Sequence, residues 1–180
     1  MSLDNTFPLN VTDELSLPYL HVTQGGLTTS PPTMQVPARL LEYAAGRFIA
    51  LPAHVTYGLV EEPTVVGIPG AATYAYGMLA WQGARLPLLD IHTLVDGDTA
   101  VELSVAPRYA LIVAYQCTAR EPLVFAAIGL ASLPKTIFIG DDAQCALPGT
   151  SQHWLQYSLS CFSYLGQAVP IVSLASLLTR

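Results

Sequence analysis

The side chains that could carry chemistry in this sequence are few and scattered. Asp90 and His92 lie two positions apart, so on a strand they would share one face and could both bind a metal ion. Two ligands do not make a metal site, and a carboxylate that caps a turn beside an exposed histidine is the more usual explanation of such a pair. We therefore expect no metal at this position.

The remaining reactive groups form no recognisable catalytic motif. Asp141 and Asp142 follow Gly140, an arrangement typical of a solvated turn. His54 and His153 have no acidic residue near them in the sequence. The chain contains no G-x-S-x-G, no phosphate-binding G-x-x-x-x-G-K-[ST], no G-x-G-x-x-G and no H-E-x-x-H pattern. These observations predict a protein that is not an enzyme and uses no cofactor.

The cysteines do not form a disulfide framework in the sequence. Cys117, Cys145 and Cys161 are odd in number, widely spaced and without a C-x-x-C pair. This pattern is typical of reduced, mostly buried thiols in a cytoplasmic protein and not of a zinc site. The longest apolar run, 123–133, is too short for a membrane-spanning helix, which needs roughly 20 residues. Since the start of the chain also lacks a secretory signal pattern, we expect a cytoplasmic protein with no membrane insertion.

Charge is scarce and unevenly distributed. Charged residues make up 11% of the chain against about 25% in an average soluble domain. The seven basic residues occur singly and the net charge is −6, which argues against nucleic acid as a partner. No Lys, Arg, Asp or Glu occurs between Glu62 and Arg85, or between Asp142 and Arg180. Such stretches are either a β-rich core with Ser, Thr, Gln and Tyr outside, or surface that a partner covers.

The elements that position these residues are mainly strands. Residues 1–36, rich in Pro, Gly, Ser and Thr, predict an extended or loosely packed arm, and 37–180 form the domain. Short β-rich segments separated by turn residues follow, at 39–43, 47–51, 55–60, 78–81, 84–90, 109–116, 123–130, 136–139, 157–165 and 168–174. Residues 173–180 can close as a short helix. This spacing favours small β-barrels or a sandwich over a parallel α/β sheet.

The stretch from Met78 to Asp90 predicts a tight hairpin. Gly83 permits the turn because glycine tolerates positive φ. Pro87 has no backbone donor, so it is compatible with an edge strand or a bulge.

The order of short motifs resembles the CheW-like domain of bacterial chemotaxis adaptors. The segments "LLEYAAGRFIALP", "VEEPTVVGIPGA" and "YAYGMLAWQGARLPLLDIHTL" follow each other as in that family, and Gly77, Gly83, Pro87 and Asp90 match its spacing. The late "YLGQAVPIVSLASLL" is similar to the closing strand pair and terminal helix. The resemblance covers roughly Pro37 to Arg180.

This resemblance implies a fold and a function. It implies two small five-stranded β-barrel subdomains followed by a short C-terminal helix. The groove between the barrels would receive the tip of a chemoreceptor helical hairpin, and the second barrel would dock on the regulatory domain of a CheA-like histidine kinase. The chain would then be a non-catalytic adaptor in chemotaxis-type signal transduction.

The sequence departs from the family pattern at specific positions. Where the family has Asn-Leu-Arg-Gly, this chain has Ala80-Trp81-Gln82-Gly83, so the arginine associated with receptor coupling is replaced by Gln82. The acid of the family's Val-Asp-x-Val strand end is also missing from Leu130-Ala131-Ser132-Leu133. These differences indicate a divergent adaptor, for twitching motility or another non-flagellar pathway.

The expected partner-binding residues lie on the Met78–Asp90 hairpin. They are Trp81, Gln82, Gly83, Arg85 and Pro87, with Gly77 and Asp90 serving the structure. Trp81 is either a core residue or an anchor for a partner, and Arg85 is expected to make a polar contact at the rim of the interface. Two alternative functions remain: a small-molecule-binding module, which a closed cavity lined by Trp81 and Tyr76 would favour, and an oligomerisation module.

Overall fold

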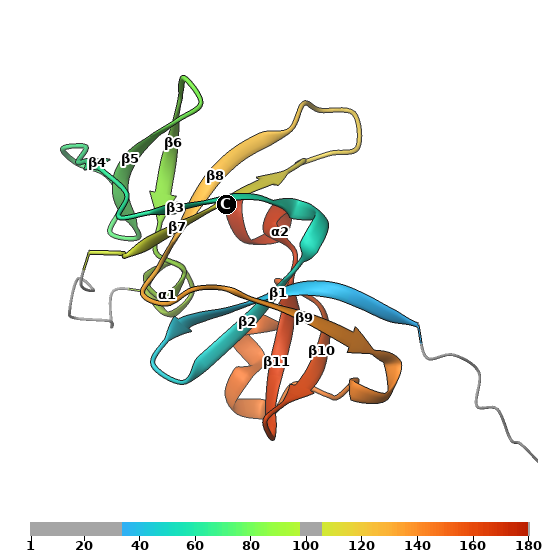
Figure 1. The fold of residues 1–180 in the computed structure, drawn as a ribbon. Coiled ribbons are helices and arrows are strands. Elements are labelled where there is room, and N and C mark those ends of the chain that lie inside the picture. Colours follow the sequence, from blue (N-terminus) through green and yellow to red (C-terminus); the bar gives the residue numbers. More distant parts are fainter. Residues whose placement is uncertain (1–33, 98–105, 180) are drawn as a thin grey trace, which may run out of the picture. The chain divides into compact units, whose positions relative to one another are not determined.

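The computed structural model describes residues 34–97 and 106–179, and these residues form two curled β-sheets and a short C-terminal helix (Figure 1). The mainly β class and the terminal helix predicted from the sequence are thus confirmed. Most of the predicted N-terminal arm lies outside the described residues. Strand β1 begins at Gln35, two residues before the predicted domain start.

Sheet A contains five strands in the order β10-β11-β2-β1-β9. Its strands are β1 (Gln35–Ala44), β2 (Arg47–Pro52), β9 (Lys135–Gly140), β10 (Ser158–Tyr164) and β11 (Gln167–Val172). After β9, the chain turns through a short 3-10 helix, η3 (Asp141–Ala143), and Gln144 forms an antiparallel bridge with Phe162. The segment that follows one edge strand therefore returns to the other edge strand, β10.

Sheet B contains six strands in the order β3-β7-β8-β6-β5-β4. Its strands are β3 (Thr56–Glu61), β4 (Val65–Val66), β5 (Ala75–Trp81), β6 (Ala84–Leu89), β7 (Tyr109–Tyr115) and β8 (Val124–Leu130). The edge strands β3 and β4 are consecutive in the chain, so this sheet also curls back on itself. Five strands were expected in each sheet, and sheet B has a sixth, the two-residue strand β4. In sheet A, the single bridge between Gln144 and Phe162 occupies the equivalent position.

The two sheets share one topology, and one hairpin in each carries the same short residue pattern. An aromatic residue, a glycine and a proline stand at equal spacing in both, as Trp81, Gly83 and Pro87 and as Tyr164, Gly166 and Pro170. In both sheets a hairpin (β5-β6 or β10-β11) leads into a short helix, and its second strand runs parallel to a strand from elsewhere, β8 or β2. The two halves of the chain exchange one hairpin each. The hairpin β1-β2, from the first half, pairs with β9 and β11 of the second half in sheet A, and the hairpin β7-β8, from the second half, pairs with β3 and β6 of the first half in sheet B.

Both hairpin turns adopt the geometry that the right-handed twist of strands favours. Gln82 and Gly83 have φ of 47° and 80°, and Leu165 and Gly166 have φ of 49° and 78°. Positive φ at both central residues is the signature of a type I′ turn. The tight turn predicted at Gln82-Gly83 is confirmed, and the two strands predicted on either side of Gly166 are joined by a turn of the same type.

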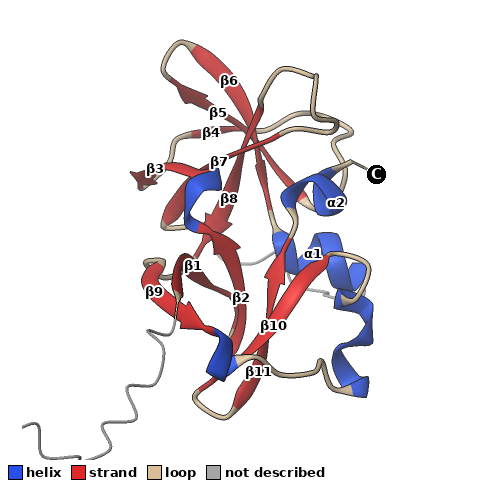
Figure 2. Ribbon diagram, turned by 90° about the vertical axis from the view of Figure 1, so that its right-hand side faces the viewer, coloured by secondary structure: helices blue, strands red, loops and turns tan. Residues whose placement is uncertain are grey.

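Two short helices follow these hairpins (Figure 2). Helix α1 (Ile91–Asp96) begins after Asp90, and helix α2 (Leu174–Leu178) begins after Ser173; each of these polar residues accepts a hydrogen bond from a backbone N–H of the first turn. Helix α2 was expected, whereas the sequence had suggested a strand through Asp90 and His92. Among the described residues, no helix has the length and apolar character that crossing a bilayer requires.

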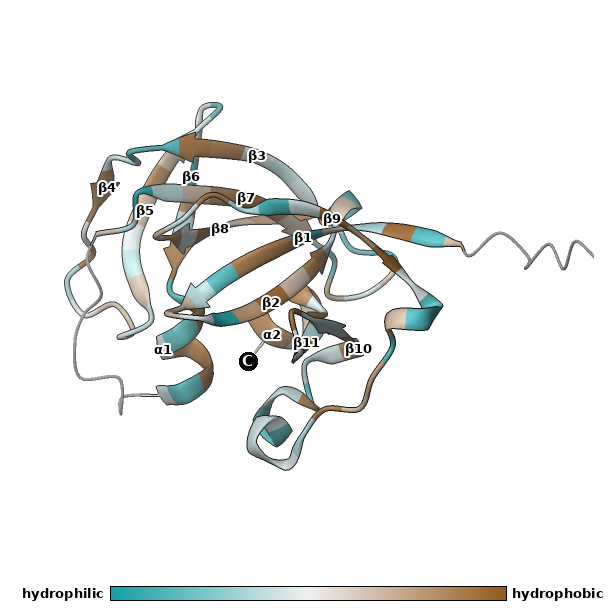
Figure 3. Cartoon of the chain, turned by 60° about the horizontal axis from the view of Figure 1, so that its bottom comes forward, coloured by the Kyte–Doolittle hydropathy of each residue, from teal (hydrophilic) through white to brown (hydrophobic). Residues whose placement is uncertain are grey.

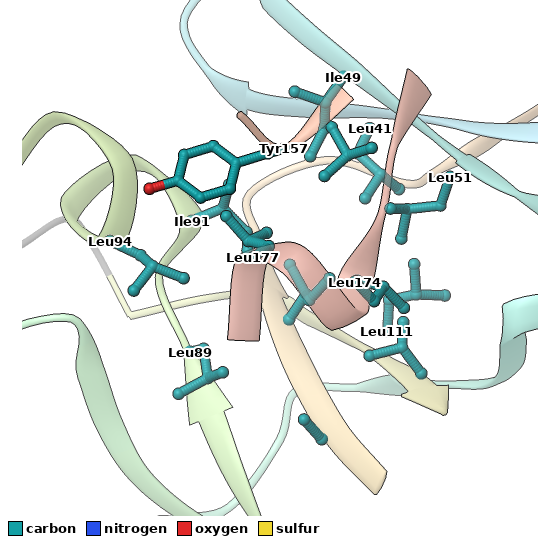
Figure 4. Close-up of a cluster of buried hydrophobic side chains, with 14 of the residues drawn as sticks. Leu41, Ile49, Leu51, Leu89, Ile91, Leu94, Leu111, Tyr157, Leu174 and Leu177 are labelled. Atoms are coloured by element: carbon teal, nitrogen blue, oxygen red, sulfur yellow. The ribbon is translucent and has the colours of Figure 1, made fainter. Parts of the chain in front are cut away.

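Buried apolar residues form three clusters. One fills the inside of sheet A, with Leu40, Ala50 and Phe162, and another the inside of sheet B, with Leu79, Leu88 and Ile112. The third takes residues from both sheets and both helices. Figure 4 labels Leu41, Ile49, Leu51, Leu89, Ile91, Leu94, Leu111, Tyr157, Leu174 and Leu177 among them. Figure 3 shows the apolar stretches along β1, β2, β7 and β8 that supply these clusters. The third cluster holds the two sheets together.

Candidate functional site

The turn at the tip of the β5-β6 hairpin is exposed. Gln82, Gly83 and Arg85 are exposed, and the register of the hairpin ends with Trp81 opposite Ala84. Gly83 has open space around its Cα, so its role is to allow φ of 80° and not to admit a neighbouring group. The side chains of Gln82 and Arg85 are thus available to a partner at this tip.

Trp81 closes one end of the cluster inside sheet B. Its indole is half-buried and lies 5.7 Å, centroid to centroid, from the ring of Phe125. Phe125 in turn meets the ring of Tyr57 edge-on at 5.3 Å. Trp81 therefore packs as a core residue, and the exposed end of this aromatic row is Tyr57, which is 50% exposed.

Pro87 lies within sheet B at a position where β6 has a partner on one side only. It stands opposite Met78 of β5, and the parallel pairing of β6 with β8 begins at Leu88. At Pro87 the strand is locally an edge, so the missing N–H leaves no ladder position unfilled. Pro87 is half-buried and serves the strand more than the surface.

Asp90 caps the first turn of helix α1. Its Oδ1 accepts a hydrogen bond from the backbone N–H of His92 at 3.0 Å, and its Oδ2 accepts one from the Thr93 hydroxyl at 2.8 Å. Because Ile91 already begins helix α1, Asp90 and His92 do not share a strand face. The shared strand face considered from the sequence is therefore wrong, and the capping alternative describes Asp90.

The carboxylate of Asp96 lies close to three basic side chains from separate parts of the chain. Its Oδ2 lies 2.8 Å from Nη1 of Arg47 and 3.3 Å from Nε2 of His92, and its Oδ1 lies 3.7 Å from Nε2 of His153. The fold thus gives His153 the acidic neighbour that it lacks in the sequence. Among residues 34–97 and 106–179, no group of three His, Cys, Asp or Glu side chains is placed to hold a metal ion. This cluster joins α1 to the β1-β2 hairpin electrostatically.

The two other candidates sit apart from this cluster. Asp141 and Asp142 form the first turn of η3 and are exposed, as expected of a solvated turn. His54 lies in the 3-10 helix η1 (Ala53–Val55) and is exposed. It lines a groove between the two sheets.

An open groove of about 360 Å³ runs between elements of sheet A and sheet B. Sheet A contributes the end of β2, β10 and the end of β11, and sheet B contributes β3 and β7. Three large apolar side chains stand exposed along it: Leu159 is 64% exposed, Tyr57 50% and Leu123 48%. The full lining is Pro52, His54, Val55, Tyr57, Ala114, Tyr115, Gln116, Leu123, Leu159, Val172, Ser173, Leu174 and Ala175. We call this the inter-sheet groove.

The inter-sheet groove is nearly free of charge. None of its lining residues is Lys, Arg, Asp or Glu. Burial raises the pKa of the Tyr115 phenol above its ordinary value, and the neighbouring Cys117 adds to this rise. The phenol is therefore neutral at physiological pH, and the groove presents an apolar surface with hydroxyl and amide groups for hydrogen bonding.

A second cavity, of about 300 Å³, lies at one end of sheet A. Its lining is mostly apolar and includes Val36, Ile139, Phe162 and Ile171; the polar members are Asp141, Gln144, Ser160 and Cys161. We call it the Val36 pocket. Neither this pocket nor the inter-sheet groove is lined by Trp81 or Tyr76, which pack against the cluster inside sheet B instead.

The predicted residues and the groove are adjacent but distinct. The groove lining does not include Trp81, Gln82, Gly83, Arg85 or Pro87. The ring of Trp81 contacts the ring of Phe125, which in turn contacts the ring of Tyr57. Sequence reasoning did not identify Tyr57, Leu123 or Leu159. The sequence did carry a signal for Tyr57 and Leu159. Each is a large apolar residue at a strand position whose side chain points outward, between two less exposed residues.

Comparison with known proteins identifies the fold. No protein-family model matches the sequence, and no curated protein is similar enough to it to count as a relative. Among solved structures, the chain is similar to the scaffolding protein TtCheW from Thermoanaerobacter tengcongensis, with a TM-score of 0.64 and 13% sequence identity. The match covers 82% of this chain and 94% of that chain. The fold is therefore CheW-like, as the resemblance in the sequence implied.

Proposed function

We propose that this chain is a non-catalytic adaptor in chemotaxis-type signal transduction, which couples a CheA-like histidine kinase to a chemoreceptor or an equivalent protein. The observation that carries this proposal is the charge-free inter-sheet groove on a CheW-like fold. The solved neighbour is described as a scaffolding protein, and the resemblance in the sequence points the same way.

The groove supports binding to a protein partner through its chemistry. Exposed Leu159, Leu123 and Tyr57 would each lose water contact under an apolar partner surface, which supplies affinity. Because no lining residue carries a fixed charge, a partner needs no complementary ion pairs in the groove. An amphipathic helix or helical hairpin, which presents apolar residues on one face, fits such a groove. We assign the groove to the receptor tip.

The β5-β6 hairpin and sheet A provide the remaining contacts in this proposal. Gln82 and Arg85, at the exposed hairpin tip, contribute polar contacts at the rim. Sheet A exposes Phe138 on strand β9, 65% accessible, and we assign this face to the kinase regulatory domain. Both contacts are expected in the micromolar range that is typical of transient signalling complexes.

The proposal is tested by measuring the two interactions separately. Binding of a cognate receptor-tip fragment and of a CheA-like regulatory domain is measured by calorimetry with wild type, Leu159→Asp and Phe138→Asp. We expect Leu159→Asp to weaken receptor binding at least about tenfold, equivalent to roughly 1.4 kcal/mol, with kinase binding retained. Phe138→Asp is expected to do the reverse.

A matched control distinguishes a groove effect from a general loss of apolar surface. Leu133 is 52% exposed, does not line the groove and follows strand β8, so Leu133→Asp introduces the same charge elsewhere. This variant is expected to bind both partners as wild type does. Absence of binding to every kinase regulatory domain and receptor fragment offered would contradict the adaptor function.

The replacement of the family arginine by Gln82 has its own test. Gln82 is exposed at the hairpin tip, so Gln82→Arg adds one cation without disturbing buried residues. If the hairpin contributes to receptor coupling, this variant binds the receptor fragment more tightly, and the gain falls as salt is added. Equal binding by both proteins would remove the hairpin tip from the proposed interface.

The Val36 pocket favours a second function, a small-molecule-binding module. Its volume of about 300 Å³ and mostly apolar lining with a few polar groups are typical of ligand sites. Screening apolar ligands by the shift of Tm, with Ile171→Trp as a variant that fills the pocket, tests it. Light scattering across a concentration series tests the further alternative of an oligomerisation module.

A further inference from the structure

Cys145 and Cys161 lie side by side, although they are sixteen positions apart in the chain. Their sulfur atoms are 3.2 Å from each other. The backbone fixes this approach: Gln144 pairs with Phe162 in an antiparallel bridge, and the N–H of Cys145 donates to the carbonyl of Cys161 at 3.0 Å. Directly opposite residues in an antiparallel pair have Cα atoms about 4.5–5.5 Å apart, within the range that a disulfide spans. A bond between the two sulfurs therefore requires side-chain rotation and little backbone movement.

The two thiols differ in access. Cys161 is 6% exposed and Cys145 is half-buried. Burial raises the pKa of the Cys161 thiol to about 12, and its contact with Cys145 adds to the rise. Cys161 thus stays protonated at physiological pH, and Cys145 is the thiol of this pair that an oxidant reaches first. Cys117, the third cysteine, is exposed on the connection between β7 and β8.

We propose that Cys145 and Cys161 form a reversible redox site, in which a hydroperoxide converts the thiol pair into an intramolecular disulfide. This inference is independent of the adaptor function. In a reducing compartment the pair is expected to be reduced at rest, since disulfides there are mostly transient and redox-sensing.

The reaction is balanced in two steps. The Cys145 thiol releases its proton to solvent, and the thiolate attacks one oxygen of the hydroperoxide, so that the O–O bond breaks. Cys145 keeps that oxygen as a sulfenic acid, and the departing oxygen takes up a proton from solvent and leaves as an alcohol, or as water from hydrogen peroxide. The Cys161 sulfur then attacks the Cys145 sulfur, forming the S–S bond and releasing water, which carries off the Cys161 proton. The two thiols lose two electrons in total, and the O–O bond takes them up. A small dithiol reverses the change by thiol–disulfide exchange.

The disulfide would link the two ends of a chain segment that contributes residues to the core between the sheets. Residues 146–160, between the two cysteines, carry the 3-10 helix η4 (Gly149–Trp154) and the buried Trp154 and Tyr157. His153 of the same helix faces Asp96 of α1. A disulfide closes this connection into a loop at its base and is expected to stabilise it by restricting the unfolded chain. The oxidised protein should therefore be the more stable form.

The experiment uses the full chain with Cys117→Ser, so that oxidation between molecules through the exposed thiol is removed. The protein is treated with one equivalent of hydrogen peroxide, unreacted thiols are blocked, and tryptic peptides are weighed. Cleavage leaves Cys145 and Cys161 together in peptide 136–180, since no Lys or Arg lies between Lys135 and Arg180. We expect this peptide to be about 2 Da lighter and unblocked, to regain both thiols on treatment with dithiothreitol, and the oxidised protein to melt roughly 5–10 °C higher.

Variants and alternative outcomes make the result decisive. Cys145→Ser should leave Cys161 as a free thiol after peroxide, and Cys161→Ala should leave Cys145 as a sulfenic acid that a dimedone probe captures. If either variant fails to fold, the mass of peptide 136–180 from the Cys117→Ser protein still decides. Two blocked thiols after peroxide, over-oxidation of Cys145 to a sulfinic acid, or no change of Tm in a protein that carries the bond would overturn the proposal.

Discussion

The Cα of Gly77 lies against the backbone carbonyl of Val66. A Cβ built on Gly77 would stand 2.4 Å from the Val66 oxygen and 2.9 Å from a Val65 methyl, and Gly77 has φ of 139°. Gly77 also lies at the register shift between β5 and β6. The short strand β4 can therefore pass this close to β5 only because residue 77 has no side chain.

Gly77→Ala is expected to destabilise the protein by about 3 kcal/mol or more, because the clash is with backbone and the φ is unfavourable for alanine. Chemical denaturation of both proteins measures the change. Gly67→Ala is the matched control: Gly67 is exposed in the same region, and its built Cβ has nothing within 4 Å. The control should stay within about 0.5 kcal/mol of wild type, and equal losses in both variants would contradict the explanation.

Gln82→Asn is expected to stabilise the β5-β6 hairpin. Gln82 has φ of 47°, which costs an ordinary L-residue roughly 1–2 kcal/mol, and asparagine tolerates this conformation better. We expect a gain of up to about 1 kcal/mol in the free energy of unfolding. Leu165 has φ of 49° in the equivalent turn of sheet A, so Leu165→Asn should gain similarly. A loss of stability in both variants would show that the turns are held by other contacts.

Leu177→Ala is expected to cost about 2–5 kcal/mol, because Leu177 is fully buried in the cluster between the sheets. Thermal and chemical unfolding measure the loss. Leu165→Ala serves as the control, since Leu165 is 83% exposed. If Leu177→Ala and Leu165→Ala unfold alike, helix α2 does not belong to the core.

The Cys161 thiol predicts how stability depends on alkaline pH. Its pKa is raised from 9.0 to about 12 by burial and by Cys145. The neutral thiol contributes to the free energy of unfolding fully below about pH 9. This contribution is lost as pH rises towards 12, because the unfolded chain releases the proton at lower pH than the folded protein does. Denaturation at a series of pH values should show a fall in stability that Cys161→Ala reduces.

The same shift predicts the order of alkylation. In the reduced protein at mildly alkaline pH, iodoacetamide should modify exposed Cys117 first and Cys161 last, with Cys161 at least roughly a hundredfold slower than in the unfolded chain. Mass spectrometry of peptides from timed samples measures these rates. Rapid modification of Cys161 in the folded protein would contradict its burial.

Local features of the fold could be predicted from the sequence because they depend on neighbouring residues. Gly83 and Gly166 mark the turns, and the strands between them were placed within a few residues. Helix α1 was missed although its signals are present: Asp90 can cap it, Ile91 and Leu94 lie one turn apart, and Gly97 follows its end. Because the residues before Asp90 form an apolar strand, the change from strand-like to helix-like spacing of apolar residues after Asp90 was overlooked.

Features that depend on distant pairing could not be predicted. The resemblance implied a groove between the barrels, but its lining by Tyr57 and Leu159 could not be predicted, because nothing local specifies which strands become neighbours. The contact of Cys145 with Cys161 follows from a single antiparallel bridge, whose register a spacing of sixteen residues does not reveal. His153 reaches Asp96 for the same reason.

The exchange of hairpins has a consequence for the autonomy of the chain's halves. Residues 35–97 hold β3 to β6 but not the hairpin β7-β8 that completes sheet B, and residues 106–179 lack β1-β2 of sheet A. Expressed separately, each fragment would carry an incomplete sheet with bare edges, whereas mixing the two should restore both sheets at once. The molecule thus resembles a dimer in which two protomers exchange a hairpin, except that both halves belong to one polypeptide.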